Sequence, residues 1–146
     1  KSNQSIKHII NKELKYKVGL PKTLKNFFKK IINLNNKLIK LIKKIKKNNQ
    51  IIHGYGASTK GNILLQFCKI GNQEIDFIAD RNMLKFNLFT PGTKIKIISE
   101  KESRSIKPNY YLVLPWHFKK EILKREIKIR KKGVKFIFPL PKIKIV

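Results

Sequence analysis

Hydrophobic positions between residues 24 and 45 recur at the spacing of an α-helix, and lysines fill the opposite face. This period predicts one long amphipathic helix, interrupted near Asn35 and Asn36 and ended by Asn48 and Asn49. A coiled-coil seam and a basic helix lying on a membrane show the same pattern, but we favour a helix that covers a sheet. The apolar stripe consists of Leu24, Phe27, Phe28, Ile31, Leu34, Leu38, Leu41, Ile42 and Ile45.

After residue 49, short apolar runs rich in β-branched residues alternate with segments of helical period. Several runs are almost continuously apolar, as expected for strands buried on both faces of a sheet. Strands joined through helices indicate an α/β fold, with a doubly wound, mainly parallel sheet flanked by helices and preceded by the long amphipathic helix. We predict strands at residues 50–55, 74–79, 94–99, 110–114 and 134–138, and helices at residues 60–69 and 118–132.

Residues 1–20 are polar and basic with scattered apolar positions, and Gly19 and Pro21 mark their end. We therefore expect residues 1–20 to be a linker from an upstream domain, and residues 21–146 to form the domain itself. Because the sequence starts at Lys1 rather than at a methionine, we expect a fragment of a longer protein.

The sequence carries no signal for membrane insertion or secretion. No apolar run approaches the roughly 18 to 20 residues that cross a bilayer, and no short apolar segment ends in a small-residue cleavage site. The single cysteine excludes a disulfide and a cysteine-based zinc cage within the chain. These features predict a cytoplasmic protein without a membrane partner.

The chain is strongly basic, with 35 Lys and Arg against 8 Asp and Glu and a formal net charge of +27. Such a charge can favour nucleic acid through the release of counterions. However, 31 of the basic residues are lysines and only four are arginines, although arginine has the forked side chain that recognises phosphate and guanine. Isoleucine (24 residues) and asparagine (13 residues) are also abundant, and all three residue types have A/T-rich codons. We therefore favour compositional bias over a nucleic-acid-binding face.

The segment with the clearest chemistry is HGYGASTKGN at residues 53–62, between the first predicted strand and the helix that follows it. Its first two glycines allow a tight turn whose backbone amides can approach a phosphate at the helix N-terminus. Ser58 and Thr59 can cap the helix or donate to an anion, and Lys60 adds a positive charge. The dinucleotide fingerprint GxGxxG is not met, because Thr59 occupies its third glycine position, and no GK[ST] triplet completes a Walker loop. A turn that only packs the helix against the strand is the alternative.

Further candidate residues follow the other predicted strands. Asp80 comes after the second strand, where a carboxylate can bind a sugar hydroxyl or cap a turn. Trp116 can form the wall of a sugar or base pocket or belong to the core, and His117 can contact a phosphate, carry a proton or serve the first turn of a helix. No Ser-His-Asp spacing, HExxH motif or close carboxylate pair is present. Cys68 falls on the apolar face of its helix, where we expect a buried, unreactive thiol.

Taken in order, the motifs GYGASTKGN, DRN, TPGTKI, LPWHF and FPLPKIKIV resemble a known family. Over residues 20–146 the chain is similar to the C-terminal domain of S-adenosylmethionine-dependent sugar C-methyltransferases, which act on nucleotide-linked deoxysugars. In that family a zinc-binding segment and a cofactor-binding methyltransferase domain precede a Rossmann-like C-terminal domain that helps to hold the nucleotide sugar. The resemblance therefore implies a Rossmann-like fold, with the methyltransferase domain of the same polypeptide as a partner.

The resemblance also implies a role for each part of the enzyme. S-adenosylmethionine and zinc are implied for the full-length enzyme and bound outside this chain, which we expect to bind the nucleotide sugar without methylating it. In the full enzyme a proton leaves the carbon next to a sugar ketone and the enolate attacks the sulfonium methyl, so this domain would orient the sugar. No catalytic or metal-binding residue is implied here. The implied nucleotide-sugar-binding residues are Gly54, Tyr55, Gly56, Ala57, Ser58, Lys60, Gly61, Asn62, Asp80, Asn82, Trp116 and His117.

Other functions remain open at this point. A NAD-type dinucleotide-binding domain of an oxidoreductase would use the same glycine turn, although the broken fingerprint disfavours it. A basic nucleic-acid-binding module would use the lysine-rich helix, and its affinity would fall steeply with salt. A remnant of a decayed gene would fold without binding anything.

Overall fold

The computed structural model describes residues 2–146, which divide into two compact units after residue 36. The first unit holds α1 (Ser2–Tyr16) and the beginning of α2 (Pro21–Lys47), and the second unit begins within α2. The long helix that the sequence predicts is present, and it continues through Asn35 and Asn36 without a break. Most of the segment predicted as a linker is helical. No helix within residues 2–146 is long and apolar enough to cross a membrane.

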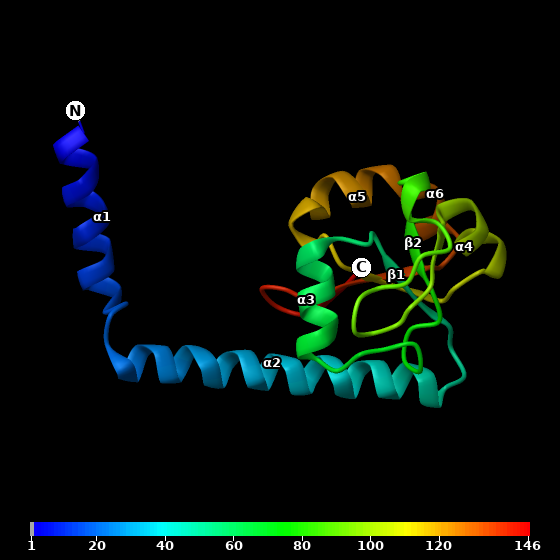
Figure 1. The fold of residues 1–146 in the computed structure, drawn as a ribbon, viewed down its shortest axis with the longest axis horizontal. Helices are drawn as coiled ribbons and strands as arrows, with labels where there is room; N and C mark the ends of the chain where they lie inside the picture. Colours follow the sequence, from blue (N-terminus) through cyan, green and yellow to red (C-terminus); the bar gives the residue numbers. More distant parts are fainter. Residues whose placement is uncertain (1) are drawn as a thin grey trace. The chain divides into compact units, whose positions relative to one another are not determined.

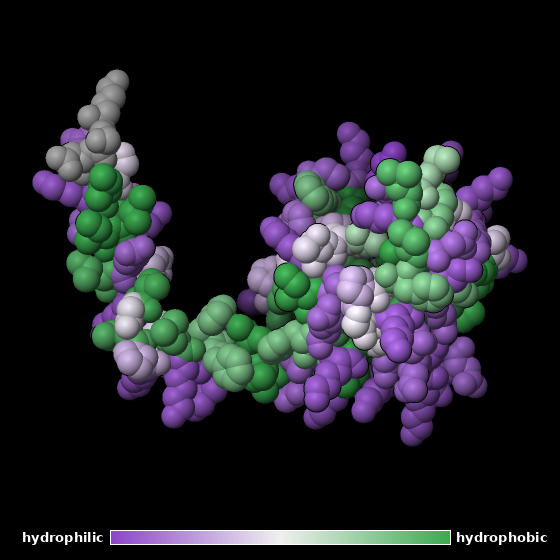
Figure 2. Space-filling model, in the orientation of Figure 1, coloured by the Kyte–Doolittle hydropathy of each residue, from purple (hydrophilic) through white to green (hydrophobic). Residues whose placement is uncertain are grey.

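The helices of the first unit expose their apolar side chains. In α1, Ile6 and Leu14 are 52% and 70% exposed, and in the first part of α2 Phe27 is 61% exposed. Figure 2 shows hydrophobic side chains along these helices next to hydrophilic ones. The apolar side chains of residues 4–36 therefore lie mostly on the surface of this unit.

The second unit is built on a six-stranded sheet. All neighbouring strands are parallel except the last pair, which is antiparallel. The spatial order reverses between β1 and β4, which is the switch point of a doubly wound sheet. The predicted α/β class and mainly parallel, doubly wound sheet are confirmed. The strands in spatial order are β3 (Ile97–Ser99), β2 (Ile78–Asp80), β1 (Ile52–Tyr55), β4 (Tyr110–Val113), β5 (Lys135–Phe138) and β6 (Lys144–Ile145).

Helices cover both faces of this sheet (Figure 1). One face carries α3 (Thr59–Phe67) and the C-terminal part of α2, and the other carries α4 (Glu100–Ile106), α5 (Lys119–Arg125) and α6 (Ile127–Lys131). Two short 3-10 turns, η1 (Met83–Lys85) and η2 (Trp116–Phe118), follow β2 and β4. The segments that leave the carboxyl ends of β1, β2 and β4 therefore meet at one edge of the sheet.

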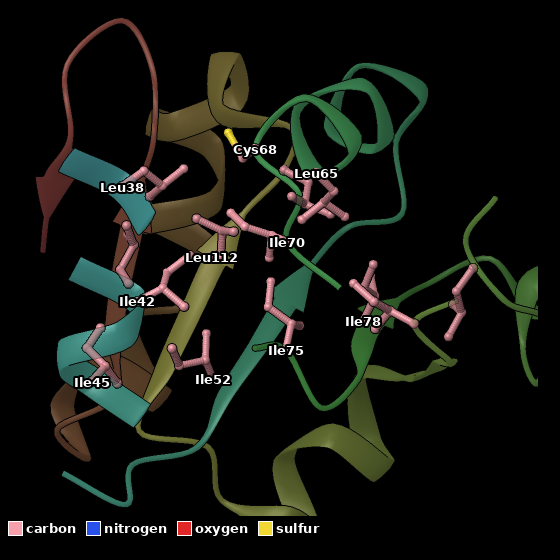
Figure 3. Close-up of a cluster of buried hydrophobic side chains, with 14 residues drawn as sticks. Leu38, Ile42, Ile45, Ile52, Leu65, Cys68, Ile70, Ile75, Ile78 and Leu112 are labelled. Carbon is pink, nitrogen blue, oxygen red and sulfur yellow. The ribbon is translucent and has the colours of Figure 1, made fainter. Parts of the chain in front are cut away.

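The larger hydrophobic core lies between the sheet and the face covered by α2 and α3. Leu38, Ile42 and Ile45 project from α2 toward Ile52 and Leu112 of the sheet (Figure 3), and each of the three is at most 4% exposed. Burying a large aliphatic side chain contributes about 1.5 to 3 kcal/mol. The C-terminal part of α2 is thus a structural layer of the α/β unit, as the favoured interpretation of its periodicity predicts.

The remaining core lies on the opposite face and is aromatic. The rings of Tyr55, Tyr111 and Phe136 contact one another with centroids 5.3 to 5.7 Å apart. This cluster also includes Ala79, Val113 and Phe138 of the sheet and Ile122 of α5. Tyr55 is the last residue of β1, so this aromatic cluster extends to the carboxyl edge of the sheet.

Some predicted boundaries differ from the structure. The strands predicted at residues 74–79 and 94–99 are present as β2 and β3, but each is only three residues long. Ile75 and Ile95, which the predictions included, are fully buried in the loops before these strands. The helix predicted at residues 118–132 divides at Glu126 into α5 and α6. Helix α4 was not predicted, since its sequence EKESRSI has little apolar character.

Candidate functional site

The glycine turn after β1 lies at the switch point of the sheet. Gly56 has φ +81°, a conformation that glycine adopts without strain, and a Cβ there would lie 2.9 Å from the ring carbons of Pro115. Gly54 is not part of this turn, because it lies within β1, where a Cβ would lie 2.8 Å from Cγ1 of Ile78. Gly56 therefore permits the turn, and Gly54 permits the close packing of β1 on β2.

The start of α3 combines a helix cap with a close helix–strand approach. Ser58 is the N-cap, and its Oγ accepts a hydrogen bond from the Gly61 amide at 3.0 Å. A Cβ on Gly61 would lie 2.4 Å from Cβ of Leu114, so only glycine lets α3 sit this close to the end of β4. The amides of Thr59 and Lys60 donate no hydrogen bond within the described chain. These two amides and the positive end of the helix can receive an anion, with the exposed Lys60 side chain beside them.

Asp80 fixes the turn from the end of β2. Its Oδ2 accepts a hydrogen bond from the Ala57 amide at 2.6 Å, and its Oδ1 accepts one from the Asn82 amide at 2.8 Å. Lys85 donates to the Ala57 carbonyl at 2.8 Å and lies 3.7 Å from Asp80 Oδ2. The Asn82 side chain caps η1 by accepting from the Leu84 amide at 3.0 Å. Asp80 and Asn82 thus make the contacts of turn caps, and their contact with a sugar stays a prediction.

A cavity of about 270 Å³, which we call the α3 pocket, opens beside this turn on the α3 face of the sheet. Its apolar lining includes the buried side chains of Ile78 and Leu114. Asn62 also lines it, and Asn62 Oδ1 is buried without a hydrogen-bond partner. No carboxylate lines this pocket. Its polar lining residues are Ser58, Thr59, Asn62, Lys85 and Thr90.

On the opposite face, two arginines and two glutamates surround the Tyr55 hydroxyl. Glu126 is 2% exposed, and its Oε1 accepts from Tyr55 Oη at 2.6 Å and from Arg104 Nη2 and Arg125 Nε at 3.1 Å. Arg125 Nη2 donates to Tyr55 Oη and, at 2.9 Å, to Glu100. Arg104 Nη2 also donates to Glu100, at 3.0 Å. We call these five residues the Arg–Glu network.

The electrostatics of the network keep its tyrosine neutral. Burial, together with the hydrogen bond to Glu126, raises the pKa of Tyr55 above its ordinary value. The Tyr55 hydroxyl is therefore protonated at neutral pH, and it can donate to Glu126 while it accepts from Arg125. Two positive and two negative side chains balance each other, so the buried Glu126 carboxylate is fully compensated.

A second cavity, of about 300 Å³, borders this network, and we call it the α5 pocket. Gly56 and Pro115 border it at the switch point, and Arg125 and Glu100 of the network line it. Arg81, Glu121 and the 53% exposed Phe118 also line the pocket. The two pockets include adjacent residues of the glycine turn, Ala57 in the α3 pocket and Gly56 in the α5 pocket.

Trp116 and His117 do not reach either pocket. Trp116 is half-buried and packs against the aromatic core cluster, with its ring edge-on to His117 at a centroid distance of 6.0 Å. His117 is exposed, and its ring lies 4.3 Å from that of Phe118. The structure thus brings the turn residues and Asp80 together at the pockets and places these two aromatic residues beside them.

Two other groups with chemical potential are buried in the fold. His53 is fully buried, its Nδ1 lies 2.8 Å from Ser103 Oγ, and Ser103 Oγ lies 2.7 Å from Tyr111 Oη. Burial lowers the pKa of His53 to about 4, so its ring is neutral at pH 7. Cys68 is 2% exposed, which confirms the expected buried thiol, and burial raises its pKa to about 11.

Sequence reasoning identified Tyr55 but not its four charged partners. Arg104 and Arg125 are two of only four arginines in a chain with 31 lysines, and this rarity was an available signal. A lysine side chain has a single nitrogen, whereas the forked arginine side chain can donate hydrogen bonds to several acceptors that lie in different directions. Glu100 and Glu126 lie in segments whose sequence has no recognisable motif, so only the fold reveals them.

Two comparisons with known proteins bear on this chain. A family model described as the C-methyltransferase C-terminal domain matches residues 1–141. The chain is 36% identical over 106 residues to the C-methyltransferase NovU of Streptomyces niveus, and the match covers 73% of this chain and 25% of that protein. The chain thus spans about a quarter of the length of this relative.

Proposed function

This chain belongs to the C-methyltransferase C-terminal domain family, and on that basis we propose that it is the nucleotide-sugar-binding domain of an S-adenosylmethionine-dependent sugar C-methyltransferase. Its role would be to orient a nucleotide-linked deoxysugar for transfer of a methyl group to carbon. The observation that carries the proposal is the glycine turn at the switch point, which has two free helix amides and a pocket on either side. Ligands of doubly wound sheets bind at such switch points.

The diphosphate of the ligand would lie on the turn. The unbonded amides of Thr59 and Lys60 suit a group that accepts two hydrogen bonds, and the Lys60 ammonium adds a positive charge that attracts a phosphate. A phosphate in this place is remote from the carbon that reacts. Its binding energy would therefore serve to hold the sugar in one orientation.

Of the two cofactors that the family implies, zinc does not fit the residues that the structure describes. No group of three His, Cys, Asp or Glu side chains that could hold zinc occurs within residues 2–146. We propose that zinc binds in another part of the enzyme, and that S-adenosylmethionine, which supplies the methyl group, does so as well, as the family resemblance implies.

The test is a single lysine substitution with a charge-matched control. In Lys60→Ala, we expect the affinity for the nucleoside diphosphates UDP and dTDP, measured by isothermal titration calorimetry, to fall by about fivefold, because one charge near the phosphate is lost. Lys128→Ala removes the same charge from an exposed side chain on α6 and should leave both affinities unchanged. Gly56→Val is a poorer test, because a side chain there meets Pro115 and a strained φ.

The Lys128→Ala control distinguishes binding of the nucleotide at a specific site from its general attraction to a basic protein. If Lys60→Ala and Lys128→Ala weaken binding equally, the nucleotide is held only by the net charge of +27, and the assignment is wrong. Absence of any binding of either diphosphate to the unsubstituted chain also contradicts the proposal.

A further inference from the structure

We infer that the α5 pocket holds the sugar ring of the nucleotide sugar, and that Arg125, fixed by the Arg–Glu network, is the side chain that orients it. This inference rests on the proposed function, which places the diphosphate on the glycine turn. It adds the position of the hexose and names residues for which the sequence offered no role.

Charge is the first observation that favours a neutral, hydroxyl-rich ligand in this pocket. The chain as a whole has 35 basic and 8 acidic residues. The α5 pocket reverses that ratio, since three carboxylates and two guanidinium groups line it and no lysine does. A diphosphate would meet net negative charge here, whereas sugar hydroxyls can donate to carboxylates and accept from arginines. The charged lining residues are Asp80, Arg81, Glu100, Glu121 and Arg125.

The second observation is that Arg125 is held in place with donors to spare. Its Nε bonds Glu126 and its Nη2 bonds Tyr55 and Glu100, and Nη1 makes no hydrogen bond within the described chain. The guanidinium plane is thus fixed from below by three acceptors, and it lies over the Tyr55 ring at 5.5 Å. Two N–H groups on Nη1 remain for a ligand in a pocket that Arg125 lines. A donor fixed in advance loses little freedom when a ligand binds.

The third observation is the contrast between the two pockets. The α3 pocket has an apolar floor and no carboxylate, which suits a nucleobase and its neighbouring phosphate. The α5 pocket has charged planar side chains and the exposed ring of Phe118 at its rim, against which one face of a sugar ring can pack. Ala57 lines one pocket and the adjacent Gly56 lines the other, so a diphosphate on the turn would have one pocket available for each of its two substituents.

The experiment compares each nucleoside diphosphate with its sugar conjugate. Affinities of the full chain for dTDP and UDP, and for their 4-keto-6-deoxyhexose conjugates, are measured by isothermal titration calorimetry. We expect the unsubstituted chain to bind each conjugate more tightly than the matching diphosphate. In Arg125→Lys the conjugate affinity should fall by about tenfold while the diphosphate affinity is unchanged, because lysine keeps the charge and loses the fork.

A second variant guards against a folding defect, because Arg125 supports the buried Glu126. Phe118→Ala changes an exposed ring outside the network, and it should weaken only the conjugates, by about fivefold. The matched controls are Arg130→Lys on α6 and Phe67→Ala on α3, a 45% exposed ring away from the α5 pocket, and neither should alter the ratio of the two affinities.

Each outcome decides between the claims. If both variants leave the conjugate affinity unchanged, or if they weaken diphosphate and conjugate equally, the sugar does not lie in the α5 pocket; equal weakening would place the nucleoside there. Either result overturns this inference and leaves the proposed function intact. If the unsubstituted chain binds neither diphosphates nor conjugates, the proposed function fails and this inference fails with it.

Discussion

Replacing Gly61 with alanine tests whether the close approach of α3 to the end of β4 sets the geometry of the site. In an ordinary helix interior, Gly→Ala stabilises by about 1 kcal/mol, because alanine loses less backbone entropy on folding. Here the added Cβ would lie 2.4 Å from Leu114 Cβ and 2.9 Å from Ser58 Oγ. The contact with Leu114 cannot be relieved by a rotamer change, since a Cβ moves only with its backbone.

Two costs therefore oppose the propensity gain. Overpacking of a well-packed site costs about 1 to 3 kcal/mol, and we take the upper end because backbone must shift. Displacing the Ser58 hydroxyl also weakens the cap of α3, which is worth about 1 kcal/mol. Subtracting about 1 kcal/mol for the propensity of alanine leaves a net destabilisation of about 3 kcal/mol.

Urea unfolding followed by circular dichroism measures this quantity from the shift of the midpoint at constant slope. Ile63→Ala is the matched control on the same helix, because Ile63 is 63% exposed and its loss should change stability by less than about 0.5 kcal/mol. Equal or greater stability of Gly61→Ala would refute the reasoning, since it would mean that the helix does not depend on this close approach.

Two further predictions concern buried polar groups. Tyr55→Phe should lower the free energy of unfolding by about 2 kcal/mol, because the buried Glu126 carboxylate loses a hydrogen-bond donor. Tyr110→Phe is the control in the same urea experiment, because the Tyr110 hydroxyl makes no hydrogen bond within the described chain. Equal losses in the two variants would show that the network adds no stability. The pKa of His53 is about 6.5 in the unfolded chain and about 4 in the fold. Between these two pH values the unfolded state therefore binds more protons than the folded state. About 3 kcal/mol of stability that is present above pH 6.5 should be lost as the pH falls to 4. Unfolding measured at pH 7 and 4.5 should show a smaller loss in His53→Gln, and an identical loss in both proteins would contradict this assignment.

Local patterns in the sequence predicted the layers of the fold. The helical period of residues 24–45 and the apolar runs at β1, β4 and β5 are strong signals, because they reflect burial of whole faces. The same rule located β2 and β3 but began each strand about three to four residues too early, because isoleucines are also buried in the loops just before these short strands. Hydropathy reports burial, and these positions are buried without being extended.

At the site, the sequence alone determined that a glycine turn would join the first strand of a parallel sheet to a capped helix, because glycine and serine at this spacing act through their own backbone neighbours. Only the tertiary structure decided what surrounds that turn. Tyr55 and Glu126 are 71 positions apart in the chain, and Arg104 and Glu126 are 22 apart. Such partners meet only after the strands have paired and α4 and α5 have packed on one face, so no local pattern records the Arg–Glu network or the pocket above it.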